Sequence, residues 1–376
     1  MYDYLLTVSY YFVIKGVDII NTKVLFLLVC FMTVSYCYAD WQPLKVYSWP
    51  ININSWEPKE IKREVIKYHS LKTAKKQWKI CVSIPHLKDS YWLAVNYALI
   101  DQAKHLGIRM RIKQAGGYTE LASQRTQIKE CMASGADGLI LSSVDTDKNN
   151  DLVQLYHSQG KLVVDLINWI SSKHISARVA VNYFDNGVEI AKYLLKHAKE
   201  PSKVLWLPGP KGPGWPAAGN KGFIQELTGS DIEIVHTAWG DTGYRIQSKL
   251  IRDALEIFPD IDYIVGTTVS ADAAIDIIRQ KNQSASIGVL SYYFSSDTFK
   301  AIQRDQIIAA ATDKQAIQAR LSVDIIVRLL EGDDSFTQIA PLVEIVDKKT
   351  LNNFISSTSV APRGFRPVFS VNDWSN

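Results

Sequence analysis

Two large aromatic residues, Tyr91 and Trp92, stand beside Asp89 in a short segment that could bind a cation. Aromatic ring faces attract cations, and a carboxylate complements positive charge, so this combination suits a quaternary ammonium group. The same two rings could instead form a staple that packs the first turn of a helix onto a sheet. The residue types alone leave both interpretations open.

The elements around this segment decide where the rings point. Residues 79–84 form a short apolar run of strand-like residues, and from Trp92 onward apolar residues recur at helical spacing. Asp89 or Ser90 can cap that helix. In an open parallel sheet, the loop that leaves the carboxyl end of the first strand lies where ligands bind. We therefore expect Tyr91 and Trp92 to face a cleft.

Strands alternate with amphipathic helices along the rest of the chain, and the alternation occurs twice. Such a pattern is typical of right-handed βαβ units and parallel sheets. The predicted fold class is therefore α/β, with two doubly wound parallel-sheet lobes. The further predicted strands are 108–112, 138–143, 162–166, 204–207, 232–236, 263–266 and 287–291, and the further predicted helices are 120–134, 149–158, 244–258, 271–280 and 314–330.

Composition bounds the class of protein. The chain has 376 residues, of which 47% are hydrophobic and 21% charged, which is typical of a soluble globular chain of two domains. Its formal net charge of +4 is small, and lysine and arginine are spread along the chain. This balance does not argue for a nucleic-acid partner. The local basic excess at 59–79 indicates a solvated helix face or an arm.

Motifs for catalysis are missing from the sequence. It contains no H-E-x-x-H, no P-loop and no G-x-S-x-G, and its seven histidines are scattered. The glycine-rich segment 208–214 includes prolines, which lack the N–H donors that a phosphate cradle needs. A metal site of Asp145, Asp147 and Asp165 is disfavoured, because aspartates at strand ends in this fold commonly cap helices. We predict neither an enzyme nor a cofactor.

The N-terminal region has the features of an export signal. Lys23 precedes the apolar run 24–32, and small residues stand at Cys37 and Ala39, the two positions that a signal peptidase reads. The run is too short to span a membrane comfortably. We expect a signal peptide over 1–39, with an atypical extension before Lys23, and cleavage near Ala39. A retained N-terminal anchor is the alternative.

The sequence has four cysteines. Cys30 and Cys37 would be removed with the signal peptide. Cys81 and Cys131 have no metal-like spacing, so they are either two buried thiols or a disulfide formed in an oxidising compartment.

Residues 40–77 are predicted to form an N-terminal extension. Its tryptophans and prolines suggest extended chain anchored by aromatic rings, followed by a charged helix over 59–76. The regular part of the chain begins at Trp78. We expect the extension to cover one lobe rather than to form a third.

The order of loop motifs resembles the type I periplasmic binding proteins, the ribose-binding group in particular, over residues 78–356. The motifs are DSYW at 89–92, GADGLILSSVDTD at 135–147, VAVNYFDNG at 179–187, KGF at 221–223 and IGVLSYYFSSD at 287–297. The resemblance implies a three-segment hinge with crossings near 181–182, 311–312 and 341–342. It places lobe 1 at 78–181 plus 313–341, and lobe 2 with the C-terminal tail at 182–312 plus 342–376.

The cleft loops differ from those of sugar-binding members of this family. Tyr91 and Trp92 stand where relatives place stacking aromatics, and Tyr118 and Tyr183 stand near polar sugar contacts. Tyr293 falls where the family pattern has an aspartate. The resemblance therefore implies a ligand site of Asp89, Tyr91, Trp92, Tyr118, Tyr183 and Tyr293 that suits a quaternary amine better than a sugar. Trp169, Trp215 and Trp239 are candidates on a looser match.

One group within the family carries the motif QAGGYTELASQ, here at 114–124, together with aromatic loops and a tryptophan-bearing extension. That group acts with a membrane sensor histidine kinase for trimethylamine N-oxide. The resemblance implies that aromatic faces hold the methylated nitrogen, that Asp89 complements its charge, and that a tyrosine hydroxyl or the Trp92 indole N–H donates to the oxide.

Three functions are weighed on this basis. The favoured one is a periplasmic receptor that binds trimethylamine N-oxide and signals to the periplasmic domain of a sensor kinase. The alternative is the solute-binding component of an ABC transporter for a small solute, either a quaternary amine or a sugar. A repressor of the related cytoplasmic family is disfavoured by the export signal and by the lack of a helix-turn-helix before Trp78. The extension at 40–76 favours the receptor, because a minimal solute receptor does not need it.

Overall fold

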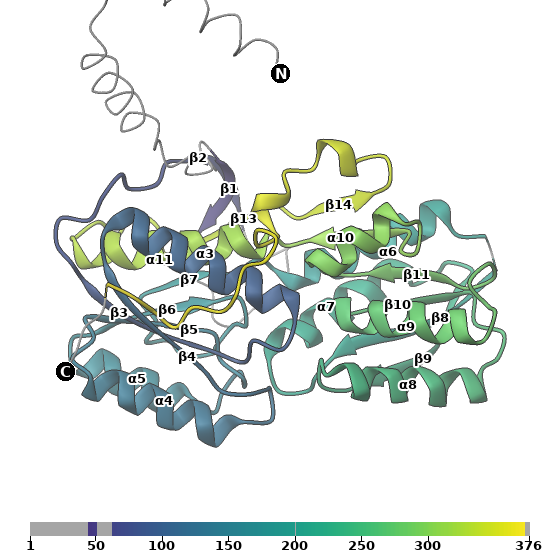
Figure 1. The fold of residues 1–376 in the computed structure, drawn as a ribbon, viewed down its shortest axis with the longest axis horizontal. Helices are drawn as coiled ribbons and strands as arrows, with labels where there is room; N and C mark the ends of the chain where they lie inside the picture. The colour runs from purple at the N-terminus through teal and green to yellow at the C-terminus, as the bar shows by residue number, and fades with distance from the viewer. Residues whose placement is uncertain (1–43, 51–61, 200, 373–376) are drawn as a thin grey trace, which may run out of the picture. The chain divides into compact units, whose positions relative to one another are not determined.

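The computed structural model describes residues 44–50, 62–199 and 201–372, which lie in one compact unit. Two sheets with helices on their faces make up this unit (Figure 1). The predicted signal peptide, residues 1–39, lies outside the described residues. Within the described residues, we find no helix with the length and apolar character needed to cross a membrane.

The first sheet has nine strands in the described part of the chain. Its central strands are parallel, with Ile80 of one strand opposite Met110 and Gly138 of its two neighbours. From edge to edge the strands are β15 (Ser370–Val371), β4 (Arg109–Gln114), β3 (Lys79–Ile84), β5 (Gly138–Leu141), β6 (Leu162–Leu166), β7 (Ala177–Val179), β13 (Gln338–Pro341), β1 (Leu44–Trp49) and β2 (Glu64–Tyr68).

Helices cover both faces of the first sheet (Figure 1). The β3 run is almost wholly buried, as expected for a parallel strand between two helical layers. One face carries α3 (Ser90–Leu106) and α11 (Gln315–Leu330), and the other carries α4 (Leu121–Ala133) and α5 (Asn150–Ser158).

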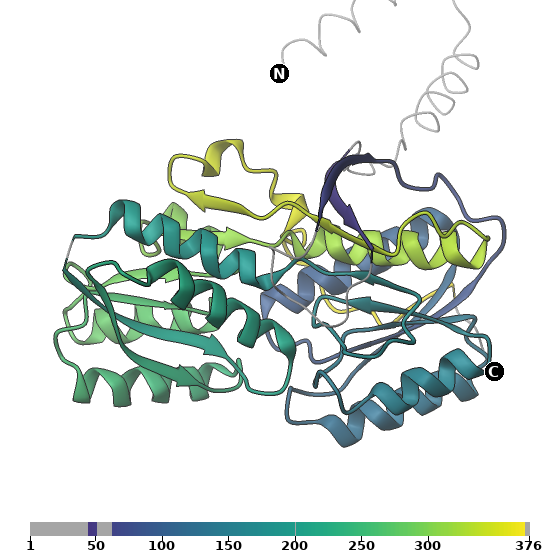
Figure 2. The same ribbon diagram turned by 180° about the vertical axis from the view of Figure 1, so that it is seen from behind.

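The second sheet has six strands among the described residues. In order, the strands are β14 (Glu344–Asp347), β12 (Ala309–Thr312), β11 (Gly288–Ser291), β10 (Tyr263–Gly266), β8 (Ser202–Gly209) and β9 (Ile232–Trp239). Figure 2 shows α6 (Tyr183–His197) and α7 (Gly214–Leu227) side by side on one face. The remaining helices are α8 (Tyr244–Ile257) and α9 (Thr268–Gln280) on the other face, α10 (Ser296–Gln303) beside α9, and the short η2 (Leu351–Asn353) and η3 (Ser356–Thr358).

Three hinge segments and the C-terminal tail carry the chain between the two sheets. The chain leaves the first sheet between β7 and α6, returns between β12 and α11, and leaves again between β13 and β14, and the tail then returns to the first sheet at β15. We call the first sheet with α3, α4, α5 and α11 the first lobe, and the second sheet with α6 to α10 the second lobe. The predicted fold class, two doubly wound parallel-sheet lobes with a three-segment hinge, is confirmed.

The edges of both sheets differ from the expectation of purely parallel pairing. β1 is antiparallel to β13 and β2, β15 is antiparallel to β4, and β14 is antiparallel to β12. An added edge strand pairs with the free N–H and C=O groups that a sheet edge otherwise leaves exposed. The C-terminal tail, which the sequence places with the second lobe, returns to the first sheet, where Ser370 lies opposite Arg111.

The N-terminal extension also differs from its prediction. Over 59–76 a charged helix is expected, whereas residues 64–68 form β2. Ile66 and Tyr68 point inward while Val65 and Lys67 are exposed, which is the period of a strand. Pairing with β1 supplies the backbone hydrogen bonds, and the Tyr68 hydroxyl donates to the carboxylate of Asp324 in α11. Tertiary partners therefore outweigh the helix propensity of the lysines.

A disulfide joins Cys81 of β3 to Cys131 of α4, with the two Cα atoms 5.7 Å apart. Of the two states that the sequence left open, the structure contains the bonded one. The bridge fastens β3, a central strand of the first sheet, to a helix on the face of that sheet.

Candidate functional site

A small cavity lies at the carboxyl ends of strands from both sheets. The volume open to the centre of a water molecule is only about 10 Å³. The total space between the atoms of the cavity is about 260 Å³. The structure brings all six predicted site residues together around it. The lining residues are Asp89, Tyr91, Trp92, Tyr118, Ile167, Asn168, Tyr183, Trp215, Thr242 and Tyr293.

The start of α3 positions two of the rings. Asp89 is the N-cap of the helix, and its carboxylate accepts a hydrogen bond from the Trp92 backbone N–H at 3.0 Å. This cap fixes Tyr91 and Trp92 in the first turn, where their rings meet edge to face at 5.6 Å. Both side chains are buried, with 4% and 2% exposure. The predicted cap and the predicted cleft position of these residues are both present.

The loop after β4 supplies Tyr118. Gly116, with φ of 109°, lets the chain turn so that its N–H and that of Gly117 donate to the Pro85 carbonyl. Tyr118 then lies beside His86, with ring centroids 5.5 Å apart, and its hydroxyl faces Asn168 at 3.5 Å. Two loops of the first lobe therefore form one wall.

The second lobe contributes the opposing rings. Tyr183 begins α6, directly after the Asn182 N-cap, and Trp215 is the second residue of α7. Tyr293 follows β11 and meets Tyr91 of the first lobe at a ring distance of 5.2 Å. It also contacts Trp215 edge to face at 5.7 Å. Aromatic rings from both lobes thus form one continuous cluster.

A buried carboxylate behind the rings was not predicted from the sequence. Asp313 lies between β12 and α11, at a hinge crossing, and is fully buried. It accepts hydrogen bonds from the hydroxyls of Tyr91 at 2.6 Å and Tyr183 at 2.9 Å. Burial raises the pKa of Asp313, and these bonds lower it. The hydroxyls of Tyr91 and Tyr183 therefore already donate to Asp313 in this structure.

Asp89 carries negative charge that no cation of the described residues neutralises. No ion pair links it to a lysine or arginine in the part of the chain described. Its pKa is raised to about 6, chiefly by desolvation and further by Asp297 and Asp241, while the N–H groups of Trp92 and Tyr91 act in the opposite direction. A cation in the cavity would relieve this unfavourable position.

His86 joins the two lobes at the rim of the cavity. Its Nδ1 accepts from the Lys88 N–H, and its Nε2 lies 3.3 Å from the Thr242 hydroxyl of the second lobe. These partners fit a neutral imidazole, and burial lowers the pKa of His86 to about 4. Ser90 also donates to Asp297 across the lobes at 2.6 Å. The structure is thus the closed form of the cleft.

The cavity residues Ile167 and Asn168 were also missed by sequence reasoning. Ile167 has a φ of 66°, which is strained for a β-branched residue. The Asn168 side chain, which donates to the Ser143 carbonyl at 2.8 Å, anchors this turn. No sequence signal marks such a backbone, because glycine would be the expected residue. Trp169 lies beside Arg178 and does not line the cavity, nor does Trp239.

The weaker alternatives from the sequence find ordinary structural roles. Asp165 pairs with Arg178 at 2.6 Å, and Asp145 accepts from the backbone N–H of Asp147 at 3.0 Å. No group of three or more potential metal ligands occurs in the described ranges. The glycine-rich segment leads into α7, which starts at Gly214 and includes Pro216, because proline is tolerated in the first turn of a helix.

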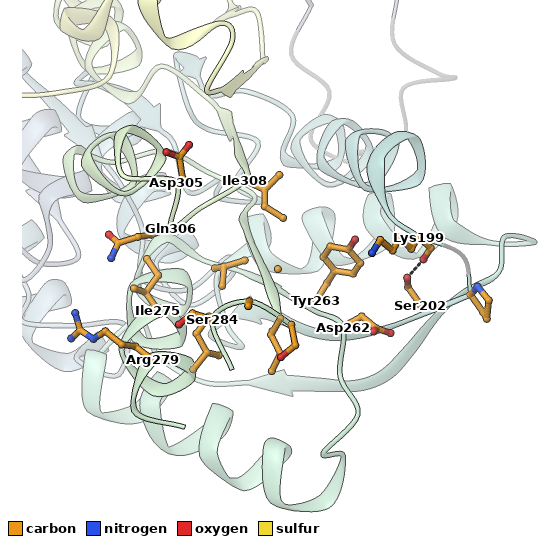
Figure 3. A pocket seen from close by; sticks show the side chains of 17 residues that line it. Lys199, Ser202, Asp262, Tyr263, Ile275, Arg279, Ser284, Asp305, Gln306 and Ile308 are labelled. Carbon is orange, nitrogen blue, oxygen red and sulfur yellow. Dashed lines mark hydrogen bonds between the residues drawn. The ribbon is translucent and has the colours of Figure 1, made fainter. Parts of the chain in front are cut away.

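A larger hollow opens at the opposite, amino-terminal ends of the second-sheet strands (Figure 3). Its volume open to the centre of a water molecule is about 690 Å³, compared with about 10 Å³ for the cavity. Two of its charged lining residues pair with residues outside it, Arg279 with Asp276 and Asp305 with Lys348. None of the predicted site residues lines this hollow.

Comparisons with known proteins agree with this geometry. Residues 80–334 match the model of the periplasmic binding protein domain. Periplasmic protein TorT of Escherichia coli K12 is 34% identical over 297 residues, which cover 79% of this chain and 85% of TorT. A solved complex of the TorS sensor domain with TorT in the presence of TMAO contains a chain 31% identical, with a TM-score of 0.71 and coverage of 78% and 99%.

A further solved structure is an ABC transporter solute-binding protein from Bradyrhizobium sp. BTAi1 with bound bis-tris. It is 37% identical, with a TM-score of 0.76, and the match covers 88% of this chain and 99% of that one. The similarity therefore extends to a sensor partner and to a transport protein.

Proposed function

The chain belongs to the periplasmic binding protein family, and we propose that it is a periplasmic receptor for trimethylamine N-oxide that signals to a TorS-like membrane sensor histidine kinase. Binding of the ligand would close the cleft, and the closed form would lead the kinase to induce trimethylamine N-oxide respiration. Two lobes joined by a hinge can adopt an open and a closed arrangement, and ligand binding would shift the equilibrium between them.

The observation that carries this proposal is the combination of aromatic walls with an unneutralised carboxylate. Six aromatic side chains line the cavity together with Asp89. Ring faces and a carboxylate favour a methylated cationic nitrogen, with each cation–ring contact contributing about 0.5–2 kcal/mol. A sugar would need a hydrogen-bonding partner for each hydroxyl, whereas six of the ten lining side chains are aromatic, and two of their hydroxyls, those of Tyr91 and Tyr183, already donate to Asp313. The small cavity volume also suits a small ligand.

The comparisons support the partner. TorT has been solved with the TorS sensor domain both without ligand and with TMAO, at 31% identity to this chain in each case. The N-terminal extension adds β1 and β2 to the edge of the first sheet, beyond β13. We propose that this added edge contributes to docking of the kinase. No catalytic step is part of the proposal.

A second candidate function is favoured by one observation. The Bradyrhizobium solute-binding protein covers 88% of this chain at 37% identity. On this alternative, the same closed cleft would deliver a small amine or sugar to an ABC permease. The same fold can serve both functions, because a sensor kinase and a permease would each recognise the closed, ligand-bound form.

Calorimetry of the mature protein tests the ligand. We expect measurable binding of trimethylamine N-oxide, weaker binding of trimethylamine, betaine and choline, and no binding of ribose. Tight ribose binding with no heat from trimethylamine N-oxide would refute the proposed ligand.

A pull-down from the periplasmic and membrane fractions tests the partner. Capture of a sensor kinase ectodomain supports the receptor, whereas capture of permease subunits supports the transport alternative.

A further inference from the structure

The indole N–H of Trp215 is a buried donor without a partner. Trp215 is 4% exposed and lines the cavity. Among the described residues that line the cavity, it is the one whose buried side-chain N–H has no hydrogen-bond partner. A buried N–H group without a partner is costly, so such a group at a ligand cavity points to an acceptor on the ligand.

The surroundings hold the Trp215 ring in place. It contacts the rings of Tyr183 at 5.8 Å and Tyr292 at 6.1 Å, in addition to Tyr293. Its benzo edge lies against Gly209, where an added Cβ would come within 2.8 Å of the ring. Gly209, with φ of 118°, therefore makes room for the indole, and the N–H lies on a different edge of the ring.

Three other donor groups around the cavity are already engaged. The hydroxyls of Tyr91 and Tyr183 donate to Asp313, and the Asn168 amide donates to Ser143. The group facing Trp215 from the first lobe is Tyr118, whose ring lies 6.1 Å away and whose hydroxyl makes only a long contact of 3.5 Å to Asn168 Oδ1. Burial raises the pKa of Tyr118, and the nearby Trp215 N–H lowers it. The Trp215 N–H nevertheless has no hydrogen-bond partner of normal geometry.

We infer that Trp215 is a specificity-determining residue, whose N–H donates, together with the Tyr118 hydroxyl, to an acceptor oxygen attached to the methylated nitrogen of the ligand. Trp215 belongs to α7 of the second lobe and Tyr118 to the loop before α4 of the first. One ligand oxygen would therefore be held from both lobes. The ligand class is the amine N-oxides, and the inference rests on the proposed function.

This donor pair discriminates against cations without an oxygen. Tetramethylammonium has nearly the same shape as trimethylamine N-oxide, but a methyl group replaces the oxygen. Its binding would leave the Trp215 N–H buried and unpaired, and sites built around a hydrogen bond reject analogues that cannot make it.

Calorimetry with trimethylamine N-oxide and tetramethylammonium tests the inference on the wild-type protein and Trp215→Phe. The variant keeps a ring face and loses the N–H. We expect its affinity for trimethylamine N-oxide to fall about tenfold or more, and its affinity for tetramethylammonium to change less than about twofold. Trp239→Phe is the matched control, because the half-buried Trp239 of the same lobe does not line the cavity.

The outcomes separate the inference from the proposed function. If Trp215→Phe loses affinity for both ligands equally, Trp215 is only an apolar wall and the inference is wrong. If the wild type binds both ligands equally well, the inference that Trp215 and Tyr118 donate to the ligand oxygen is also wrong. The proposal of a site for a methylated ammonium group is then retained. If the wild type binds neither ligand, the proposed function itself fails. Should Trp215→Phe melt far below Trp239→Phe, Tyr118→Phe provides the same comparison of the two ligands.

Discussion

The two hollows at opposite ends of the second-sheet strands differ in size and in chemistry. The volume open to the centre of a water molecule is about 10 Å³ in the cavity at the carboxyl ends. In the hollow at the amino ends, the same volume is about 690 Å³. The small cavity has aromatic walls from both lobes and an unneutralised carboxylate. The large hollow belongs to one lobe, and its charged residues Arg279 and Asp305 are paired.

This difference shows why volume is a poor guide to the site. The hinge can enlarge the small cavity, because it lies between two lobes that meet through hydrogen bonds such as Ser90 to Asp297. The hollow at the amino ends is lined by the second lobe alone, so a molecule bound there would not contact both lobes and would not directly favour their closure. A ligand that shifts the hinge equilibrium must contact both lobes.

The strongest test of the comparison is Trp92→Ala. If Trp92 is a wall of the ammonium site, its removal should weaken binding of trimethylamine N-oxide by about 1–3 kcal/mol, up to about 100-fold, as cation–π and apolar contacts are lost. If it acts only in packing, the change should instead cost about 3–5 kcal/mol of unfolding free energy with affinity retained. Calorimetry and thermal melting on one sample compare the two losses, and unchanged affinity would remove Trp92 from the site.

The pH dependence of binding provides the next largest effect. Desolvation raises the pKa of Asp89 to about 6, and a bound cation would lower it. Binding is therefore strongest above pH 6, where Asp89 is already ionised, and weakens by up to about tenfold per pH unit below it. Titration with tetramethylammonium measures this effect, because the charge of that ligand does not change with pH.

Asp89→Asn is the matched variant for this pH dependence. Asparagine keeps the helix cap and removes the charge, so the Asp89 part of the pH dependence should disappear. What remains reports His86, which must be neutral in the closed form and whose protonation also opposes closure as the pH falls below its ordinary value of 6.5. An identical profile in the variant and the wild type would contradict the role of Asp89.

Ligand size gives a smaller effect. Choline keeps the trimethylated nitrogen but carries a longer arm, so it must hold the lobes further apart. We expect it to bind about fivefold more weakly than trimethylamine N-oxide in parallel titrations. Ribose would fit the large hollow by volume but should give no heat. Equal affinities for choline and trimethylamine N-oxide would mean that the cleft is not closed tightly around its ligand.

The smallest expected effect comes from the other hollow. Arg279→Ala removes a charged wall of the hollow and a surface ion pair with Asp276, and such pairs contribute about 0–1 kcal/mol. We expect less than a twofold change in affinity for trimethylamine N-oxide. A loss of tenfold or more in calorimetry would show that the two hollows are coupled, and the contrast between them would need to be redrawn.

Local sequence signals predicted the strands and helices, and the resemblance to the type I periplasmic binding proteins implied the residues of the cavity. The apolar run of β3, the Asp89 cap and the helical spacing after Trp92 are local features, and each element formed where expected. The six predicted residues gather at one cavity because the carboxyl ends of parallel strands meet at one edge. Their role in binding a ligand remains a prediction.

Long-range and backbone features could not be read in the same way. Asp313 is 222 residues from Tyr91, so their hydrogen bond has no local signature. The positive φ of Ile167 is atypical of its residue type, and the Cα distance of the disulfide does not follow from the spacing of Cys81 and Cys131. The lysines near β2 suggested a helix, because a strand there depends on its partner β1.

The pairing of β1 with β13 also sets an order in which the chain can fold. Val46 lies opposite Pro341, so the first described strand must wait until nearly the whole chain has been synthesised. Until then the edge of β7 lacks its partner β13, and the apolar residues of β1 stay uncovered. Contacts between such distant segments slow folding, and open strand edges favour aggregation. The exposed edge of β1 is therefore open to pairing with other chains until the last strands arrive.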